Sequence, residues 1–310
     1  MKMYTLMTND VEHTSITKNG LSFETGEKVS NVGIPRLLEL YSKNNVTSTF
    51  YFTGEFARDF PLAVQEVKKH GHEIGCHGFS HRTEHSFDEI SPKEQFLHLK
   101  LAKRTIEKIS GPIEAFRAPA LRLGNETPKI LEMLGFKTDS SIASQRFDGP
   151  LTFGSLRKLN WLFAKRKPYF LSARNPFYCG ETDVLELPVS SAVLAYQGTT
   201  MRVSPKINDL LGDFLHKEST ESKPIVFLFH PNEAITEKIT DTFNFRGKNF
   251  FSRLFGDRLR RNLKLRNLGS SSIKLLQRII DKSKREGNTF VTASQYRKIF
   301  IEKQKYNNEA

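Results

Sequence analysis

The chain has 310 residues, of which 38% are hydrophobic, so it is long enough to bury one large core. No stretch approaches the roughly 20 apolar residues that a membrane-spanning helix needs, and the first apolar run, 3–7, leads directly to Asp10 rather than to a cleavage site. Two cysteines, Cys76 and Cys179, give no disulfide framework and fit a reducing compartment. We therefore expect a cytoplasmic protein.

The net charge of +13 is concentrated near the end of the chain. Residues 246–310 hold 17 of the 47 Lys and Arg but 5 of the 34 Asp and Glu, which gives this region a net charge of +12. The preceding 245 residues are therefore close to neutral.

Strand and helix patterns alternate along nearly the whole sequence. In chain order we expect a strand at 4–7, a helix at 34–43, a strand at 48–52, a helix at 61–70, a strand at 73–75, a helix at 91–109, a strand at 115–117, a helix at 127–134, strands at 137–140 and 185–188, a helix at 205–216, a strand at 225–230, a helix at 271–286 and a strand at 289–291. Ser91 and Glu94 form a capping box around Pro92, which is a typical helix start.

This alternation predicts a parallel sheet. We expect one α/β domain over residues 1–310, folded as a distorted (β/α)7-type barrel, since a barrel is the usual closed form of such a sheet. A doubly wound sheet is the alternative, but the chain has no GxGxxG or P-loop pattern.

Polar side chains fall at the expected carboxyl ends of strands, where parallel α/β folds bind their ligands. Asp10 and Glu12 follow the first strand, His77 and His81 follow the third, Arg117 ends the fourth and His230 ends a later one. We expect this set to form one site.

His77 and His81 are four residues apart, so a helical turn would place both rings on one face, where they would hold a divalent metal. Gly78 excludes the zinc-peptidase pattern, which needs glutamate directly after the first histidine. Glu12 would complete a two-histidine, one-carboxylate site with open positions for water and substrate. Zinc is the default metal for these ligands, and iron, cobalt, nickel and manganese are alternatives.

The remaining residues supply acid and base roles. Asp10 would accept the proton of the attacking water, and Arg117 would keep Asp10 ionised. His230 would donate a proton to the leaving amine, with Asp139 as a partner that sets its tautomer. The alternatives are that Asp10 and Glu12 cap a helix and that Asp139 closes a strand with a turn.

Together these segments resemble the polysaccharide deacetylase family, also called the NodB-homology or carbohydrate esterase 4 family. The resemblance runs through nearly the whole chain and rests on the segments 6–10, 48–54, 71–77, 116–119, 185–188 and 227–230. It implies a distorted (β/α) barrel and the metal-dependent removal of an acyl group from an N-acylated sugar. It also implies a base at Asp10, metal ligands at His77 and His81, an arginine holding the base at Arg117 and an acid at His230.

The chain departs from the pattern of this family at several positions. Val11 stands where most members have a second, metal-binding aspartate, so Glu12 takes that role in our interpretation. Gly78 replaces a serine or threonine, Ala120 replaces an aromatic residue, and no tryptophan follows Asp139. These changes bear on substrate preference more than on the type of reaction.

The basic region contains a second pattern. Between residues 249 and 268, Phe251, Phe255, Leu259 and Leu263 recur at every fourth position among arginines and lysines, which predicts a basic amphipathic helical segment at about 245–270. Such a helix either contacts an anionic membrane surface or packs its apolar stripe on the barrel.

We therefore expect a metal-dependent hydrolase that removes an N-acetyl or related acyl group from a sugar in a polysaccharide, a lipid-linked glycan or a sugar nucleotide. Its location would be cytoplasmic, at the inner face of the membrane if the basic helix binds there. The alternative is a catalytically inactive carbohydrate-binding barrel. Nucleic acid is not an expected partner, because no recognised nucleic-acid motif accompanies the basic region.

Overall fold

The computed structural model describes residues 2–147, 160–238 and 258–309. Its main sheet contains seven parallel strands in the order β13 (Ile225–Phe229), β1 (Met3–Val11), β4 (Ser48–Phe52), β5 (Glu73–Cys76), β6 (Ala115–Phe116), β7 (Thr138–Asp139) and β10 (Leu185–Glu186). The antiparallel strands β8 (Tyr169–Ser172) and β9 (Asn175–Cys179) extend the sheet beyond β10, and β14 (Asn288–Phe290) pairs with the start of β1.

The sheet curls into an incompletely closed barrel. Ser190, just after β10, donates its backbone N–H to Val226 O at 3.0 Å, and Val226 N donates to Ser190 Oγ at 2.9 Å. The segment that follows the last parallel strand therefore reaches back to β13. The predicted single-domain α/β barrel is confirmed, in a curled and distorted form.

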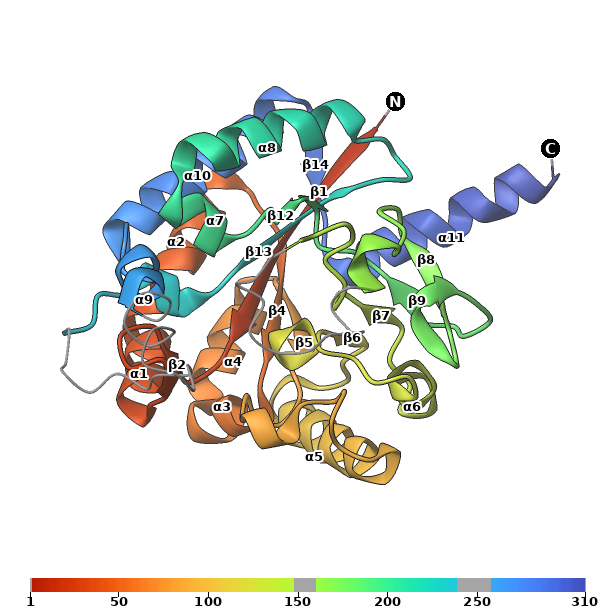
Figure 1. Ribbon diagram of the computed structural model, residues 1–310, viewed down its shortest axis with the longest axis horizontal. Coiled ribbons are helices and arrows are strands. Elements are labelled where there is room, and N and C mark those ends of the chain that lie inside the picture. Colours follow the sequence, from red (N-terminus) through yellow and green to blue (C-terminus); the bar gives the residue numbers. More distant parts are fainter. Residues whose placement is uncertain (1, 148–159, 239–257, 310) are drawn as a thin grey trace.

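Helices surround the outside of the sheet (Figure 1). They are α1 (Phe23–Lys28), α2 (Ile34–Asn44), α3 (Gly54–Asp59), α4 (Pro61–Lys69), α5 (Pro92–Ser110), α6 (Thr127–Met133), α7 (Gly198–Val203), α8 (Pro205–Glu218), α9 (Arg258–Lys264), α10 (Ser270–Arg285) and α11 (Ala293–Glu309). Two short hairpins, β2 (Thr14–Ser15) with β3 (Gly20–Leu21) and β11 (Ser191–Ala192) with β12 (Leu194–Ala195), lie outside the main sheet. No helix within the described ranges combines the length and apolar character needed to cross a bilayer.

The six predicted helices all form within about two residues of their expected bounds, because their ends carry strong local signals. The capping box at α5 is present: Ser91 N donates to Glu94 Oε2 at 2.8 Å and Glu94 N donates to Ser91 Oγ at 3.3 Å. Of the basic helical segment expected at about 245–270, residues 245–257 lie outside the described residues, and α9 covers Arg258–Lys264.

Strand β1 gives the barrel an apolar floor and a polar mouth. Because side chains alternate along a strand, Tyr4 and Leu6 share one face with Asp10, whereas Met7 and Val11 pack into the outer core. The floor is a cluster of buried residues that includes Tyr4, Leu6, Tyr51, Leu185, Val226 and Tyr296. Water is therefore excluded from one end of the barrel, and the polar side chains gather at the other.

Helix α11 was not among the predicted elements. Its first turns close the apolar end of the barrel: Tyr296 is fully buried, its ring lies 5.8 Å from that of Tyr4, and its hydroxyl donates to Glu221 O at 2.9 Å. The helix carries a basic, mostly polar sequence, so its periodicity gave no strong signal.

We expect Tyr296→Ala to lower the free energy of unfolding by about 3 kcal/mol or more, because it leaves a cavity in the barrel floor. Tyr306→Ala, on the same helix but 73% exposed, is the matched control and should change this free energy by less than about 0.5 kcal/mol. Urea unfolding of both variants measures the difference. Equal effects would show that α11 does not close the barrel.

Candidate metal and active site

Three candidate metal ligands meet at the ends of β1 and β5. Glu12, His77 and His81 each offer one ligand atom, and these atoms all lie within 4.8 Å of one another. Glu12 is 5% exposed, and its Oε2 atom, 3.3 Å from His81 Nε2, is buried and accepts no hydrogen bond from the described residues. A buried carboxylate oxygen without a donor is costly unless a cation compensates it. The three residues therefore fit a divalent metal.

The backbone fixes the orientation of the His77 ring. His77 Nδ1 lies 2.9 Å from the carbonyl oxygen of Arg117, so Nδ1 carries the proton and the Nε2 lone pair faces the site. Burial lowers the pKa of His77, although Asp10 and Glu12 act to raise it. The ring is therefore neutral, which is the form that binds metals.

The sequence analysis predicted that His77 and His81 lie on one helical turn, and this prediction is wrong. The chain turns instead at Gly78, whose φ of 68° favours glycine and whose added Cβ would come within 3.0 Å of Pro119. This turn brings the His81 ring to 5.7 Å from that of His77, and Ala120 N donates to His81 Nε2 at 3.1 Å. The glycine that departs from the family pattern is thus required by the backbone.

Asp10 lies within β1 rather than after it, at the centre of the polar mouth. It is 3% exposed, and its Oδ1 accepts a hydrogen bond from Arg117 NH1 at 2.9 Å. Its Oδ2 lies 3.8 Å from His77 Nε2 and 3.9 Å from His230 Nε2. Burial alone would raise the pKa of Asp10, but Arg117 and the two histidines outweigh burial and hold this pKa below its usual range. Asp10 is therefore an ionised base at neutral pH.

Arg117 is fully buried, and each of its three guanidinium nitrogens donates at least one hydrogen bond. Its NH1 also donates to Thr8 Oγ1 at 2.9 Å, Nε donates to Ser140 O at 2.7 Å, and NH2 donates to Ser140 Oγ at 2.6 Å. Its guanidinium group lies over the ring of Tyr51, 4.6 Å from the centroid. Arg117 is therefore fixed as the partner of Asp10, as the sequence predicted.

His230 lies between two carboxylates. Its Nε2 faces Asp10, and its Nδ1 lies 3.9 Å from Glu233 Oε2. Burial acts to lower the pKa of His230, but the neighbouring carboxylates of Glu233 and Asp10 outweigh burial and raise this pKa to about 9. The ring is therefore a protonated donor at neutral pH, and 25% of it is exposed to an incoming molecule.

Arg202, on α7, keeps Glu233 ionised. Arg202 Nε donates to Glu233 Oε1 at 2.9 Å, and burial of Glu233 is outweighed by Arg202 and His230, which lower its pKa to about 2. Arg202 NH1 also donates to the carbonyl oxygens of Lys264 and Arg266, so the end of the basic helix α9 packs against α7.

The expected pairing of Asp139 with His230 is wrong. Asp139 forms a buried pair with Glu186, the residue opposite it on β10, and accepts a short hydrogen bond from Ser141 Oγ. Burial raises the pKa of Asp139 to about 7 despite these hydrogen bonds, and burial beside Asp139 raises that of Glu186 well above its usual range. Ser141 Oγ accepts from Ala118 N at 2.8 Å, so the pair supports the loop after Arg117.

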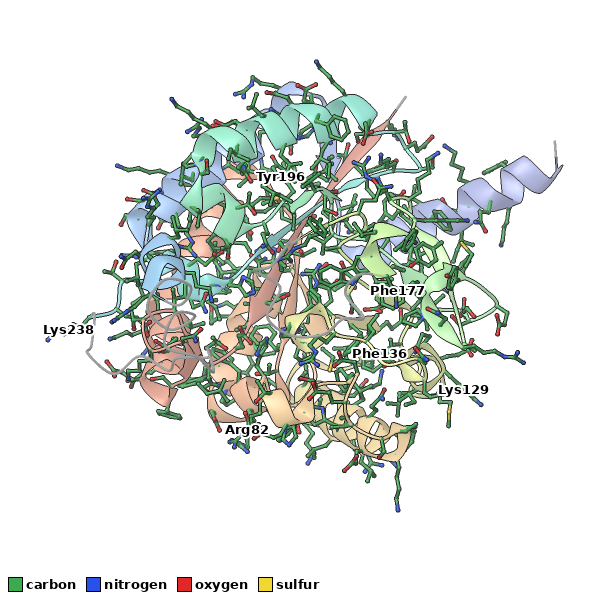
Figure 2. The ribbon with its side chains drawn as sticks, in the orientation of Figure 1. Arg82, Lys129, Phe136, Phe177, Tyr196 and Lys238 are labelled. Atoms are coloured by element: carbon green, nitrogen blue, oxygen red, sulfur yellow. The ribbon has the colours of Figure 1, made fainter. Side chains whose placement is uncertain are left out.

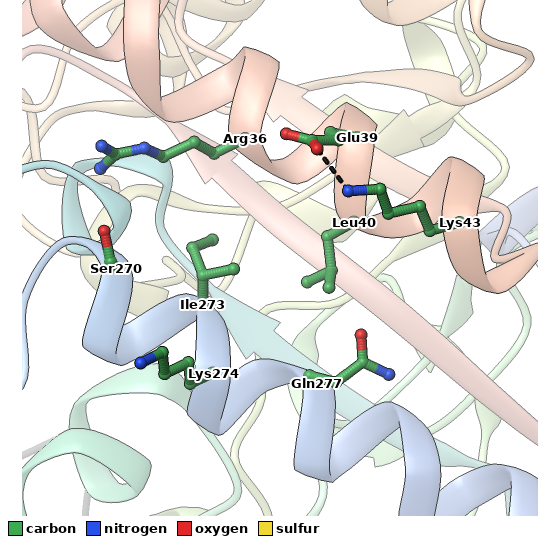
Figure 3. Close-up of a pocket in the computed structure, with 8 residues that line it drawn as sticks. All are labelled: Arg36, Glu39, Leu40, Lys43, Ser270, Ile273, Lys274 and Gln277. Atoms are coloured by element: carbon green, nitrogen blue, oxygen red, sulfur yellow. Dashed lines mark hydrogen bonds and ion pairs between the residues drawn. The ribbon is translucent and has the colours of Figure 1, made fainter.

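Helices α2 and α10 donate hydrogen bonds to the turn that follows His230. Arg36 NH1 donates to Ala234 O at 2.6 Å, and Ser272 Oγ donates to Glu233 O at 2.8 Å. A groove of about 420 Å³ separates these two helices, with Arg36 at one end and Glu39 paired with Lys43 along its side (Figure 3). None of the predicted site residues lines this groove.

The structure thus brings together six of the seven predicted site residues, namely Asp10, Glu12, His77, His81, Arg117 and His230. Sequence reasoning missed the roles of Glu233 and Arg202. Glu233 follows His230 by three residues, and this spacing was a usable signal. No comparable sequence signal pointed to Arg202, because Arg202 and Glu233 are brought together only by the tertiary fold.

Comparison with known proteins shows a similarity to one family over part of the chain. A family model described as polysaccharide deacetylase matches residues 13–138. The chain is 30% identical over 116 residues to a peptidoglycan deacetylase from Helicobacter pylori, covering 37% of this chain and 39% of the relative. It spans about two fifths of the length of the first curated relatives it matches. The matched residues include His77, His81 and Arg117. They do not include Asp10, Glu12 or His230.

Solved structures extend the likeness of fold to the whole chain. A probable polysaccharide deacetylase from Pseudomonas aeruginosa superimposes with a TM-score of 0.61 at 14% identity, covering 96% of this chain and 90% of that one. A pseudoenzyme of the CE4 family from Bacillus anthracis superimposes with a TM-score of 0.53 at 14% identity, covering 96% of this chain and 66% of that one. The shared fold is therefore the deacetylase barrel.

We expect Glu233→Gln to lower the pKa of His230 from about 9 toward its ordinary value of about 6.5, because the substitution removes the charge that stabilises the protonated ring. NMR titration of the His230 ring in chelator-treated protein measures this shift, with circular dichroism to verify the fold. Glu221→Gln, at the opposite end of the barrel, should leave the pKa of His230 where it is in the wild type. An unchanged pKa in Glu233→Gln would contradict the assigned pairing.

Proposed function

We propose that the chain is a member of the polysaccharide deacetylase family, which the match over residues 13–138 supports, and that it is a metal-dependent hydrolase that removes an N-acetyl or related acyl group from a sugar. One observation carries the proposal: the Glu12, His77 and His81 cluster lies beside an ionised Asp10 and a protonated His230. Hydrolysis of an amide needs these roles together, since a base must activate water and an acid must protonate the leaving nitrogen.

Glu12, His77 and His81 would hold the metal, with zinc as the default and iron, cobalt, nickel or manganese as alternatives. A divalent metal bound there supplies Lewis acidity, which makes water a stronger acid and polarises a carbonyl group. The orphaned Oε2 atom of buried Glu12 and the neutral ring of His77 support this assignment.

The chain's own residues carry the protons. Asp10 is ionised and its Oδ2 faces the ligand cluster, so it accepts the proton of the attacking water. His230 is protonated and partly exposed, and it donates from Nε2 to the leaving amine nitrogen. Arg117 keeps Asp10 charged, while Glu233 holds His230 in its protonated form.

The substrate we propose is an N-acylated glycan, either a polysaccharide, a lipid-linked glycan or a sugar nucleotide. The curated relatives include peptidoglycan and chitin deacetylases, which supports a sugar that carries an N-acetyl group. All three kinds of substrate have the same reacting groups, namely the amide carbon, the attacking water and the leaving nitrogen. The same residues would therefore catalyse hydrolysis of each of them.

We expect Asp10→Asn to lower acetate release from N-acetylated glycans by about 10²- to 10⁴-fold, because the amide cannot accept the proton of water. Acetate assays on metal-loaded wild type and variant measure this loss. Asp183→Asn, an exposed carboxylate paired with Lys137, is the control and should retain full activity.

An equally active Asp10→Asn variant would contradict the assignment of the base. Wild-type protein that releases no acyl group from any glycan tested would favour the alternative, a carbohydrate-binding barrel without catalysis. The likeness to a CE4 family pseudoenzyme and the replacement of the family's second aspartate by Val11 are the observations behind that alternative.

We further propose that the protein acts in the cytoplasm, where its basic segment contacts the anionic inner face of the membrane. The net charge of +12 over residues 246–310 supports this location, since each basic residue near such a surface contributes about 1 kcal/mol to binding. Replacing Arg253, Arg258, Arg260 and Arg261 by Gln should abolish sedimentation with anionic vesicles. Binding that persists unchanged, or that is equal on neutral vesicles, would contradict the proposal.

A further inference from the structure

The turn between the two candidate metal ligands His77 and His81 lies beyond the strand pairing of the barrel. Strand β5 ends at Cys76, and Arg82, which follows His81, lies at the periphery of the molecule (Figure 2). The conformation of this turn sets the distance between the two imidazole rings. The contacts that hold the turn therefore determine the geometry of the ligand cluster.

The start of α3 holds the turn from one side. Gly54 N donates to Gly78 O at 2.9 Å, and Glu55 N donates to Phe79 O at 2.8 Å. A Cβ added at Gly54 would lie 2.5 Å from the Phe79 ring, so the helix packs directly on the turn. These two hydrogen bonds use carbonyl groups of the turn, and the N–H of Phe79 is bonded elsewhere.

His98, on α5, accepts the N–H of Phe79. The distance from Phe79 N to His98 Nδ1 is 3.3 Å, and the two rings meet edge to face with their centroids 6.0 Å apart. His98 Cε1 also lies 3.5 Å from the position that a Cβ on Gly78 would take. The imidazole ring therefore contacts both of the residues that follow His77.

The ring of His98 is neutral and its tautomer is fixed. Burial lowers its pKa to about 4, and the neighbouring ring of His85 acts in the same direction. Because Nδ1 accepts a hydrogen bond, the proton of the neutral ring is on Nε2. Nε2 is buried and finds no acceptor among the residues that the structure describes. A buried donor without a partner costs stability, which a role in the site would explain.

We propose that His98 is a positioning residue for the metal site: its Nδ1 lone pair fixes the turn at Phe79 and thereby the spacing of His77 and His81. This inference rests on the proposed function only in so far as these two histidines and Glu12 bind a metal. His98 acts through the turn and is not itself one of the ligands.

The test measures metal affinity and stability separately. His98→Phe keeps an aromatic ring at this position but removes the acceptor for the N–H of Phe79. We expect it to weaken zinc binding by about 10- to 100-fold in competition with a chromophoric chelator, because a group that orients the ligands is lost. The urea midpoint of the metal-free variant should stay close to that of metal-free wild type, because the unpaired Nε2–H is removed together with the acceptor. A role in folding alone predicts a lower midpoint and an unchanged affinity for zinc.

Two further variants serve as rescue and control. His98→Asn is the rescue, since its Oδ1 atom takes the place of Nδ1 as acceptor, and its affinity for zinc should lie within about threefold of wild type. His216→Phe removes another buried histidine, on α8, and should leave the affinity unchanged. The visible spectrum of the cobalt-loaded protein reports the ligand arrangement and should change only in His98→Phe.

An unchanged zinc affinity in His98→Phe, an equal loss in His98→Asn, or wild-type protein that binds neither zinc nor cobalt overturns the inference. Acetate release by the zinc-loaded wild type is measured in parallel on N-acetylated glycans. Weaker zinc binding by His98→Phe without acetate release by the wild type keeps the positioning role and removes the hydrolase. Acetate release together with an unchanged affinity in His98→Phe keeps the hydrolase and removes the positioning role.

Discussion

The buried ion pair between Arg117 and Asp10 is the interaction on which the rest of the site depends. Two charges removed from water are stable only if their remaining hydrogen-bonding groups are satisfied. Here Arg117 meets that condition through Thr8 and Ser140 as well as Asp10, with Tyr51 beneath its guanidinium group. The pair links β1 to β6 across the interior of the barrel and keeps a carboxylate ionised where burial alone would protonate it.

From this pair a line of alternating charges crosses the barrel mouth, from Arg117 through Asp10, His230 and Glu233 to Arg202. Each buried charge has an opposite charge beside it, so each holds its neighbour in the ionised form. The base and the acid are therefore set by one network, in which Asp10 stays deprotonated and His230 stays protonated at the same pH. The candidate metal ligands lie beside the middle of this line.

The sequence predicted what depends on local spacing. The position of Asp10 and Glu12 at the end of the first strand indicated that both carboxylates belong to the site, and helix caps and prolines located most helices. Local spacing could not predict which carboxylate pairs with His230, because Asp139 and Glu233 both lie near strand ends. The tertiary fold places Asp139 beside Glu186 and Glu233 beside His230. Helix α11 was missed because one buried face of a mostly polar helix leaves little periodicity.

Anomalous diffraction from zinc-soaked crystals would test the central claim most directly. The account predicts one strong peak at about 2.0–2.2 Å from ligand atoms of Glu12, His77 and His81, which disappears when both histidines are replaced by alanine. A peak elsewhere, for example at the buried Asp139 and Glu186 pair, or no peak at the cluster, would contradict it. His70→Ala, which alters an exposed histidine on the barrel surface, should leave the peak unchanged.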